Sequence, residues 1–149
     1  MPGYAYLDSS AIVKLVVAEP ETAALERDIA DRIALLSSRL SATEVLRAAR
    51  RQPDRRVLQQ AQDVLDSFVF LEVTPAILKR AGAIGPADLR TLDAIHLATA
   101  LGLGLADLEF LTYDARLARA ARAQGLDVAE PEGKAKGRRQ KAKVKSGRF

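Results

Sequence analysis

Short apolar runs alternate along the chain with longer stretches whose hydrophobic residues recur at a helical spacing. The runs at 4–8, 68–73 and 108–112 are rich in branched and aromatic side chains, which predicts strands. Residues 126–128 predict a short last strand. Residues 33–36 fit either a strand or the end of the preceding helix, because periodicity does not decide so short a run.

Periodic apolar positions and capping residues predict helices between these strands. Ser9 or Ser10 is placed to cap the first helix, and Leu92, Ile95 and Thr99 are spaced to face a core in a later one. The predicted helices cover about 9–17, 21–30, 41–52, 53–67, 75–81, 89–101 and 114–124.

The alternation of strands and helices predicts an α/β fold. Right-handed crossovers then give a three-layer sandwich, with a mostly parallel central sheet and helices on both faces. A chain of 149 residues suits one domain with a sizeable core. We expect residues 1–131 to form that domain and residues 132–149 to form a basic, flexible tail.

Composition narrows the classes of function. The chain has no cysteine, which excludes disulfides, thiolate metal sites and a cysteine nucleophile. No segment approaches the roughly 20 apolar residues of a membrane span, and the first residues lack a signal-peptide pattern. We therefore expect a cytoplasmic protein that does not enter a membrane.

Positive charge is concentrated at the end of the chain. Residues 134–149 hold eight basic side chains and no acidic one, so the net charge of +4 becomes −4 for residues 1–133. This tail fits either a solvated terminus or an arm that follows RNA phosphates without sequence preference. Its basic residues are Lys134, Lys136, Arg138, Arg139, Lys141, Lys143, Lys145 and Arg148.

Four acids stand where apolar elements begin or end. Asp8 and Asp114 follow predicted strands, while Glu44 and Asp93 lie in the first turns of predicted helices. Ligands of open α/β sheets bind at the carboxyl ends of the strands. If the four carboxylates meet there, their repulsion is relieved by a divalent cation such as Mg²⁺ or Mn²⁺, which prefers oxygen ligands.

Each of these acids also has a structural interpretation. Ser41 and Glu44 match a capping box, and Asp93 and Asp114 complement helix dipoles. A carboxylate at the end of a buried strand, as at Asp8, is harder to explain without a ligand.

Four further polar residues accompany the acids. His96, the only histidine, is either a general base or a packed and hydrogen-bonded core residue. Arg90 either contacts a phosphate or pairs with Asp88 or Asp93. Two hydroxyl side chains are either caps or partners of a ligating oxygen, namely Ser10 and Thr112.

Four segments together resemble the motifs of PIN-domain nucleases, in order and spacing. They are Tyr6-Leu7-Asp8-Ser9-Ser10-Ala11-Ile12-Val13-Lys14-Leu15, Ser41-Ala42-Thr43-Glu44-Val45, Arg90-Thr91-Leu92-Asp93-Ala94-Ile95-His96-Leu97-Ala98 and Phe110-Leu111-Thr112-Tyr113-Asp114-Ala115-Arg116-Leu117. Within that superfamily the chain looks most like the VapC toxins of toxin-antitoxin pairs. The similarity spans residues 4 to about 128 and leaves out the basic tail.

The resemblance implies an endoribonuclease that depends on Mg²⁺ or Mn²⁺. Asp8 and Asp93 correspond to the acids that bind the principal metal, and Glu44 and Asp114 to those that bind a second ion or act through water. Similar proteins form homodimers and are silenced by a cognate antitoxin. The partners expected from the resemblance are therefore RNA, an antitoxin and a second copy of the chain.

Two other functions stay open at this point. Asp8 also fits the phosphoryl acceptor of a haloacid-dehalogenase-like phosphatase. Such enzymes usually carry a second acid two residues later, whereas this chain has Ser10 at that position. A non-catalytic module that binds RNA or an antitoxin is the other alternative, with the basic tail supplying the affinity.

Overall fold

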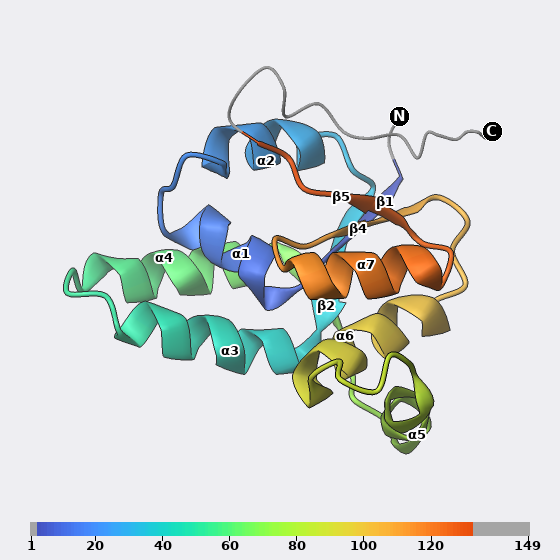
Figure 1. The fold of residues 1–149 in the computed structure, drawn as a ribbon. Helices are drawn as coiled ribbons and strands as arrows, with labels where there is room; N and C mark the ends of the chain where they lie inside the picture. Colours follow the sequence, from blue (N-terminus) through green and yellow to red (C-terminus); the bar gives the residue numbers. More distant parts are fainter. Residues whose placement is uncertain (1–2, 133–149) are drawn as a thin grey trace.

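Five parallel strands form the centre of the protein (Figure 1). The structure is a computed structural model that describes residues 3–132. The strands are ordered β3-β2-β1-β4-β5, and residues 34–36 of the ambiguous run 33–36 belong to a strand and not to a helix end. Their bounds are β1 (Tyr4–Leu7), β2 (Ala34–Ser38), β3 (Phe68–Leu71), β4 (Leu108–Leu111) and β5 (Asp127–Ala129).

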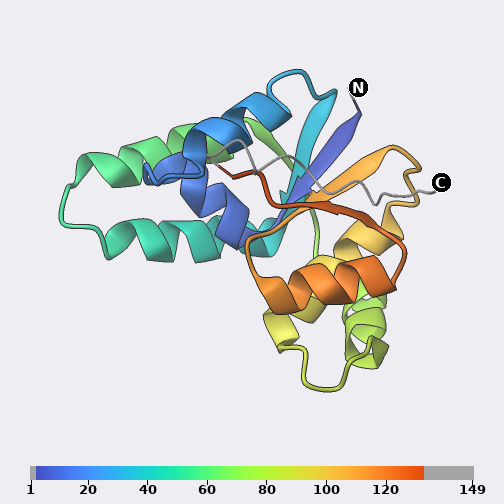
Figure 2. The same cartoon turned by 45° about the horizontal axis from the view of Figure 1, so that its top comes forward.

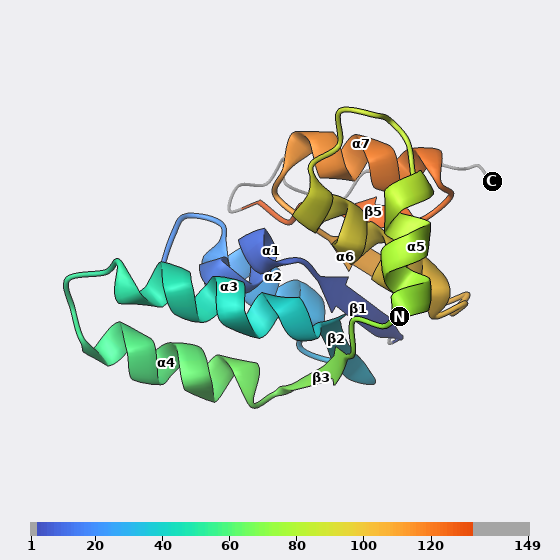
Figure 3. The same ribbon diagram turned by 90° about the horizontal axis from the view of Figure 1, so that it is seen from below.

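Seven helices cover the two faces of this sheet in the described part of the chain, which confirms the three-layer α/β sandwich (Figures 1, 2 and 3). One face carries α1 (Ser9–Val16), α2 (Thr22–Ile29), α3 (Arg39–Arg50) and α4 (Arg56–Leu65). The other face carries α6 (Thr91–Gly102) and α7 (Ala115–Ala123), and α5 (Pro75–Ala83) packs against α6.

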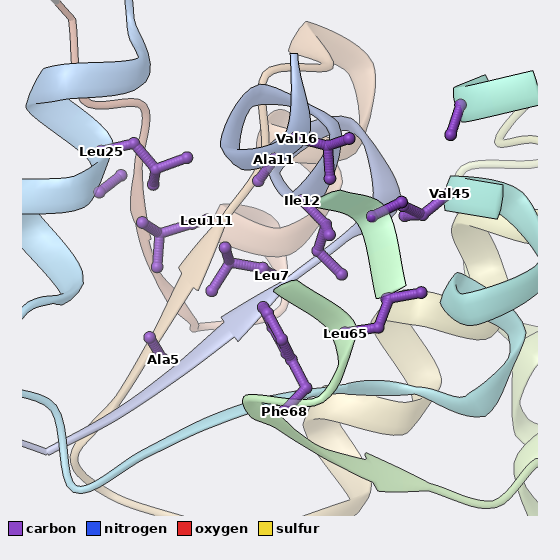
Figure 4. Packing of buried hydrophobic residues seen from close by; sticks show 13 residues of the cluster. Ala5, Leu7, Ala11, Ile12, Val16, Leu25, Val45, Leu65, Phe68 and Leu111 are labelled. Carbon is purple, nitrogen blue, oxygen red and sulfur yellow. The ribbon is translucent and has the colours of Figure 1, made fainter. Parts of the chain in front are cut away.

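Alternate side chains of β1 enter the two layers. Ala5 and Leu7 pack with residues of α1 to α4, including Ile12 and Leu25 (Figure 4). Tyr6 points to the opposite layer, where its ring stacks on Phe110 with 5.3 Å between the ring centroids. Because both faces of the strand are buried, β1 is apolar along its whole length.

The register of the sheet determines which residues meet at its carboxyl edge. Leu7 at the end of β1 lies beside Leu111 at the end of β4. The residues that follow these two strands are therefore neighbours in space, although they are about 100 positions apart in sequence. This edge holds Asp8 and Thr112.

The structure corrects three details of the sequence prediction. Asp8, rather than Ser9 or Ser10, caps α1, because its side chain accepts a hydrogen bond from Ala11 N. Helix α3 begins at Arg39 with Ser38 as its cap, two residues before the predicted start. Leu92 is 45% exposed and does not face the core.

The new start of α3 also removes the capping-box interpretation of Glu44. Ser38 Oγ accepts from Leu40 N at 3.2 Å, whereas Ser41 lies inside the helix and bonds to the hydroxyl of Ser37 at 2.6 Å. Glu44 lies more than one turn into the helix, beyond the reach of the N-cap. The capping box therefore does not explain the presence of a glutamate at this position.

Two expectations from the sequence concern the basic tail and the absence of a membrane span. The basic side chains predicted to bind RNA, from Lys134 to Lys145, lie outside residues 3–132. Within that range no helix is long and apolar enough to cross a membrane.

The assignment of Ser38 as the cap of α3 predicts the effects of one serine and one threonine substitution. Ser38→Ala should lower the free energy of unfolding by about 1 kcal/mol, because Leu40 N loses its acceptor. Thr43→Ala, at an exposed position of the same helix, should change it by less than about 0.5 kcal/mol. Urea unfolding measures both, and equal effects would contradict the assignment.

Candidate metal and RNA site

Three hydrogen-bond donors hold the buried carboxylate of Asp8. One oxygen, Oδ1, accepts from Ser10 Oγ at 2.7 Å and from Ala11 N at 3.0 Å. The other, Oδ2, accepts from Thr112 Oγ1 at 2.6 Å. A carboxylate offers about four acceptor positions, so Asp8 is fixed in orientation and one position remains for a ligand.

The loop after β4 is tied to this carboxylate by the same hydroxyl groups. Ser10 Oγ accepts from Tyr113 N, and Thr112 Oγ1 accepts from Asp114 N, both at 3.0 Å. Asp114 in turn caps α7 through the backbone N–H groups of Arg116 and Leu117. Ser10 and Thr112 therefore bridge the ends of β1 and β4 and orient the acids there.

Arg90 lies between two of the acids. Its Nε is 3.4 Å from Asp93 Oδ2, and its Nη2 is 3.1 Å from Asp114 Oδ2. Of the two sequence interpretations of Arg90, pairing with a carboxylate is the one observed, although its partners are Asp93 and Asp114 and not Asp88. The arginine side chain is 71% exposed and can leave without disturbing the core.

Glu44 reaches the site from α3 and contacts the only histidine. His96 Nε2 is 3.0 Å from Glu44 Oε1, and His96 Nδ1 is 2.8 Å from the hydroxyl of Tyr6. The histidine is 1% exposed, so it is a packed and hydrogen-bonded residue. Its burial separates it from any substrate in the cavity.

All four acids line one cavity of about 450 Å³ at the carboxyl edge of the sheet. Ser10 and Arg90 line it as well, while Thr112 is buried behind Asp8. Arg51, at the end of α3, also lines the cavity. Nothing in the sequence marks Arg51 or Tyr6 as neighbours of the acids, because both come from apolar or highly basic surroundings.

The donor atoms fit a hard divalent cation, although the carboxylates are not gathered around one point. Among residues 3–132, no three acidic or histidine side chains are placed to hold one ion together. Asp93 and Asp114 are turned toward Arg90, which supplies a positive charge there. A bound Mg²⁺ or Mn²⁺ would have to displace that guanidinium and would meet oxygen ligands only.

The pKa values of Asp8 and Asp93 show that ionised carboxylates are unfavourable in this site. Burial raises the pKa of Asp8 despite the opposing effects of His96 and three hydrogen bonds. Burial and then the charge of Asp114 raise the pKa of Asp93, against the pull of Arg90. Burial also disfavours ionised Glu44, but the hydrogen bond and charge of His96 outweigh it and lower the pKa of Glu44.

The raised pKa values of Asp8 and Asp93 predict a fall in stability with rising pH, whereas the lowered pKa of Glu44 acts in the opposite direction only near and below its ordinary pKa of 4.5. Between the ordinary pKa of about 3.9 and the raised values, the folded protein holds more protons on Asp8 and Asp93 than the unfolded chain. The free energy of unfolding should therefore decrease as these groups ionise, and added Mn²⁺ should restore it at neutral pH but not at acid pH.

Urea midpoints between about pH 4 and pH 8 measure this effect. Asp8→Asn should flatten the decrease, because the amide keeps the cap acceptor without the charge. The exposed control Asp66→Asn should leave the profile unchanged. A wild-type profile that rises with pH over this range would contradict the assigned shifts.

Comparison with known proteins shows the family to which the protein belongs. A sequence model of the PIN domain family matches residues 5–123. Over 128 residues the chain is 45% identical to ribonuclease VapC46 of Mycobacterium tuberculosis, covering 85% of this chain and 96% of that protein.

Solved structures agree on the fold. VapC20 of Mycobacterium tuberculosis, a toxin that cleaves the sarcin-ricin loop, superposes with a TM-score of 0.66 at 15% identity, covering 82% of this chain and 95% of that one. The chain of a Klebsiella pneumoniae toxin-antitoxin complex gives a TM-score of 0.61 at 22% identity, covering 75% and 88%. The family match and the closely related ribonuclease together show that the protein belongs to the PIN-domain family and, within it, to the VapC ribonucleases.

Proposed function

We propose that the protein is a Mg²⁺- or Mn²⁺-dependent endoribonuclease and the toxin of a toxin-antitoxin pair. The observation that carries this proposal is the arrival of four carboxylates from four separate elements in one cavity. The relatives of this protein that are named VapC ribonucleases support hydrolysis of RNA as its reaction. Asp8 and Asp93 are the proposed principal ligands, and Glu44 and Asp114 hold a second ion or a metal-bound water.

The side chains prepare the site in different ways. Asp8 is held by three donors and keeps one acceptor position, so it acts as a fixed ligand. Asp93 and Asp114 become available when Arg90 turns away, and that guanidinium is then free to bind a phosphate oxygen of the RNA. A divalent ion in such a site activates water and stabilises the leaving oxygen of the phosphodiester.

The geometry argues against the phosphatase alternative. A carboxylate nucleophile needs an unencumbered oxygen that can approach phosphorus in line. Both oxygens of Asp8 already accept short hydrogen bonds, and its side chain is 2% exposed. In addition, the residue two positions after Asp8 is Ser10 instead of the second acid of such phosphatases, and its hydroxyl donates to Asp8 Oδ1.

Partners are proposed on the same basis. One solved structure with this fold is a toxin-antitoxin complex, which supports a cognate antitoxin for this chain. A homodimer is expected from the family alone. We propose that residues 132–149 form a separate basic arm on RNA, in which case deletion of 134–149 should weaken RNA binding and reduce its salt dependence while cleavage persists.

Substitution of the proposed principal ligands tests the nuclease. Asp8→Asn and Asp93→Asn should each reduce Mn²⁺-stimulated cleavage of total cellular RNA on the order of 10²-fold or more, because the ion loses a charged ligand. Asp66→Asn should cleave like the wild type. Circular dichroism melts establish that the variants fold, and full activity in folded Asp93→Asn would refute the assignment.

Arg51 tests where the RNA backbone runs. It lines the cavity, and the one hydrogen bond that its guanidinium makes within residues 3–132 is a 3.5 Å contact with the backbone oxygen of Arg47. We expect it to bind a phosphate. Arg51→Ala should raise KM about fivefold, equivalent to about 1 kcal/mol, with kcat nearly unchanged.

Arg50 provides the matched control for this experiment. It is the exposed neighbour of Arg51 on α3 and does not line the cavity. Arg50→Ala should therefore leave KM within about twofold of the wild type. Equal increases in KM for both variants would indicate a general effect of positive charge and not a phosphate contact in the cavity.

A further inference from the structure

A buried chain of hydrogen bonds reaches the acidic cavity from inside the protein. It runs from the Tyr6 hydroxyl on β1 through the His96 ring on α6 to the Glu44 carboxylate on α3. Tyr6 and His96 are 0% and 1% exposed, while the Glu44 side chain is 22% exposed and lines the cavity. Three elements that are distant in sequence thus meet behind one proposed ligand.

We propose that His96, held by Tyr6, is a positioning residue that fixes the carboxylate of Glu44 for metal binding. The proposal rests on the proposed function, since Glu44 is assigned there to the second ion or its water. His96 does not touch RNA or metal in this arrangement, because the carboxylate and the protein interior enclose its two nitrogens.

The partners of the ring determine its tautomer. An ionised carboxylate only accepts hydrogen bonds, so the 3.0 Å contact with Glu44 Oε1 requires a hydrogen on His96 Nε2. On the other side of the ring, Nδ1 lies 2.8 Å from the Tyr6 hydroxyl, which fixes the orientation of the imidazole. Burial raises the pKa of Tyr6, which keeps that hydroxyl protonated and able to donate.

The hydrogen bonds from Tyr6 through His96 orient the carboxylate of Glu44, which packing alone does not do. Glu44 is on the surface side of α3, where its flexible side chain is able to find water. Fixing such a side chain costs rotamer entropy that an ordinary surface glutamate does not lose. A fixed donor behind the carboxylate supplies that order and directs Glu44 into the cavity.

Two substitutions of similar size separate positioning from simple packing. The amide nitrogen of glutamine reaches the place of His96 Nε2 and is able to donate to Glu44, whereas the shorter asparagine reaches only the place of Nδ1 beside Tyr6. Each variant keeps one of the two contacts and leaves one partner unsatisfied. A structural role predicts similar losses in both, while positioning predicts a difference between them.

The measurement is Mn²⁺ binding by titration calorimetry on the full chain, with urea unfolding in parallel. His96→Asn should weaken Mn²⁺ binding by about 10- to 100-fold, and His96→Gln should stay within about threefold of the wild type, although both lose stability. RNA cleavage should follow the same order. Equal Mn²⁺ affinities in the two folded variants would overturn the proposal.

A spectroscopic measurement keeps this test separate from the nuclease hypothesis. Nitrogen NMR of the His96 ring in the wild type should show a hydrogen on Nε2, whether or not the protein binds Mn²⁺. A hydrogen on Nδ1 instead would overturn the positioning role. Absence of Mn²⁺ binding and cleavage in a wild type that shows the expected tautomer would refute the proposed function, and with it the role of Glu44 as a ligand.

Discussion

The burial of a single carboxylate at the end of β1 determines much of the site. Asp8 is 2% exposed, and its charge is tolerable only because hydroxyl and backbone donors from α1 and the loop after β4 converge on it. The same donors orient Asp114 through Thr112. A requirement to satisfy one buried charge therefore also arranges the neighbouring loop and the start of α7.

Repulsion among the acids is the second constraint. The raised pKa values of Asp8 and Asp93 show that hydrogen bonds only partly offset burial. Arg90 neutralises Asp93 and Asp114 from the exposed side, and His96 supports Glu44 from the buried side. The site thus combines an exposed counterion with a buried hydrogen-bond partner, which suits carboxylates that must accept an exchangeable cation.

The sequence predicted the sheet and most helices because apolar runs and capping residues are local signals. The strand at 33–36 was ambiguous because so short a run has no period, and pairing with β1 decided it. The cap of α3 was misplaced by two serines three residues apart, either of which suits a helix start. The four acids stood out at element ends, but the partners of His96 were not predictable, since contacts across 52 and 90 positions depend on packing.

The most direct test of a shared cation site is a crystal structure with Mn²⁺ and anomalous diffraction. The four-carboxylate site predicts an anomalous peak about 2.1 Å from oxygens of Asp8 and Asp93, with the Arg90 side chain turned away from Asp93. A peak elsewhere, or no peak with Arg90 still bridging Asp93 and Asp114, would contradict it.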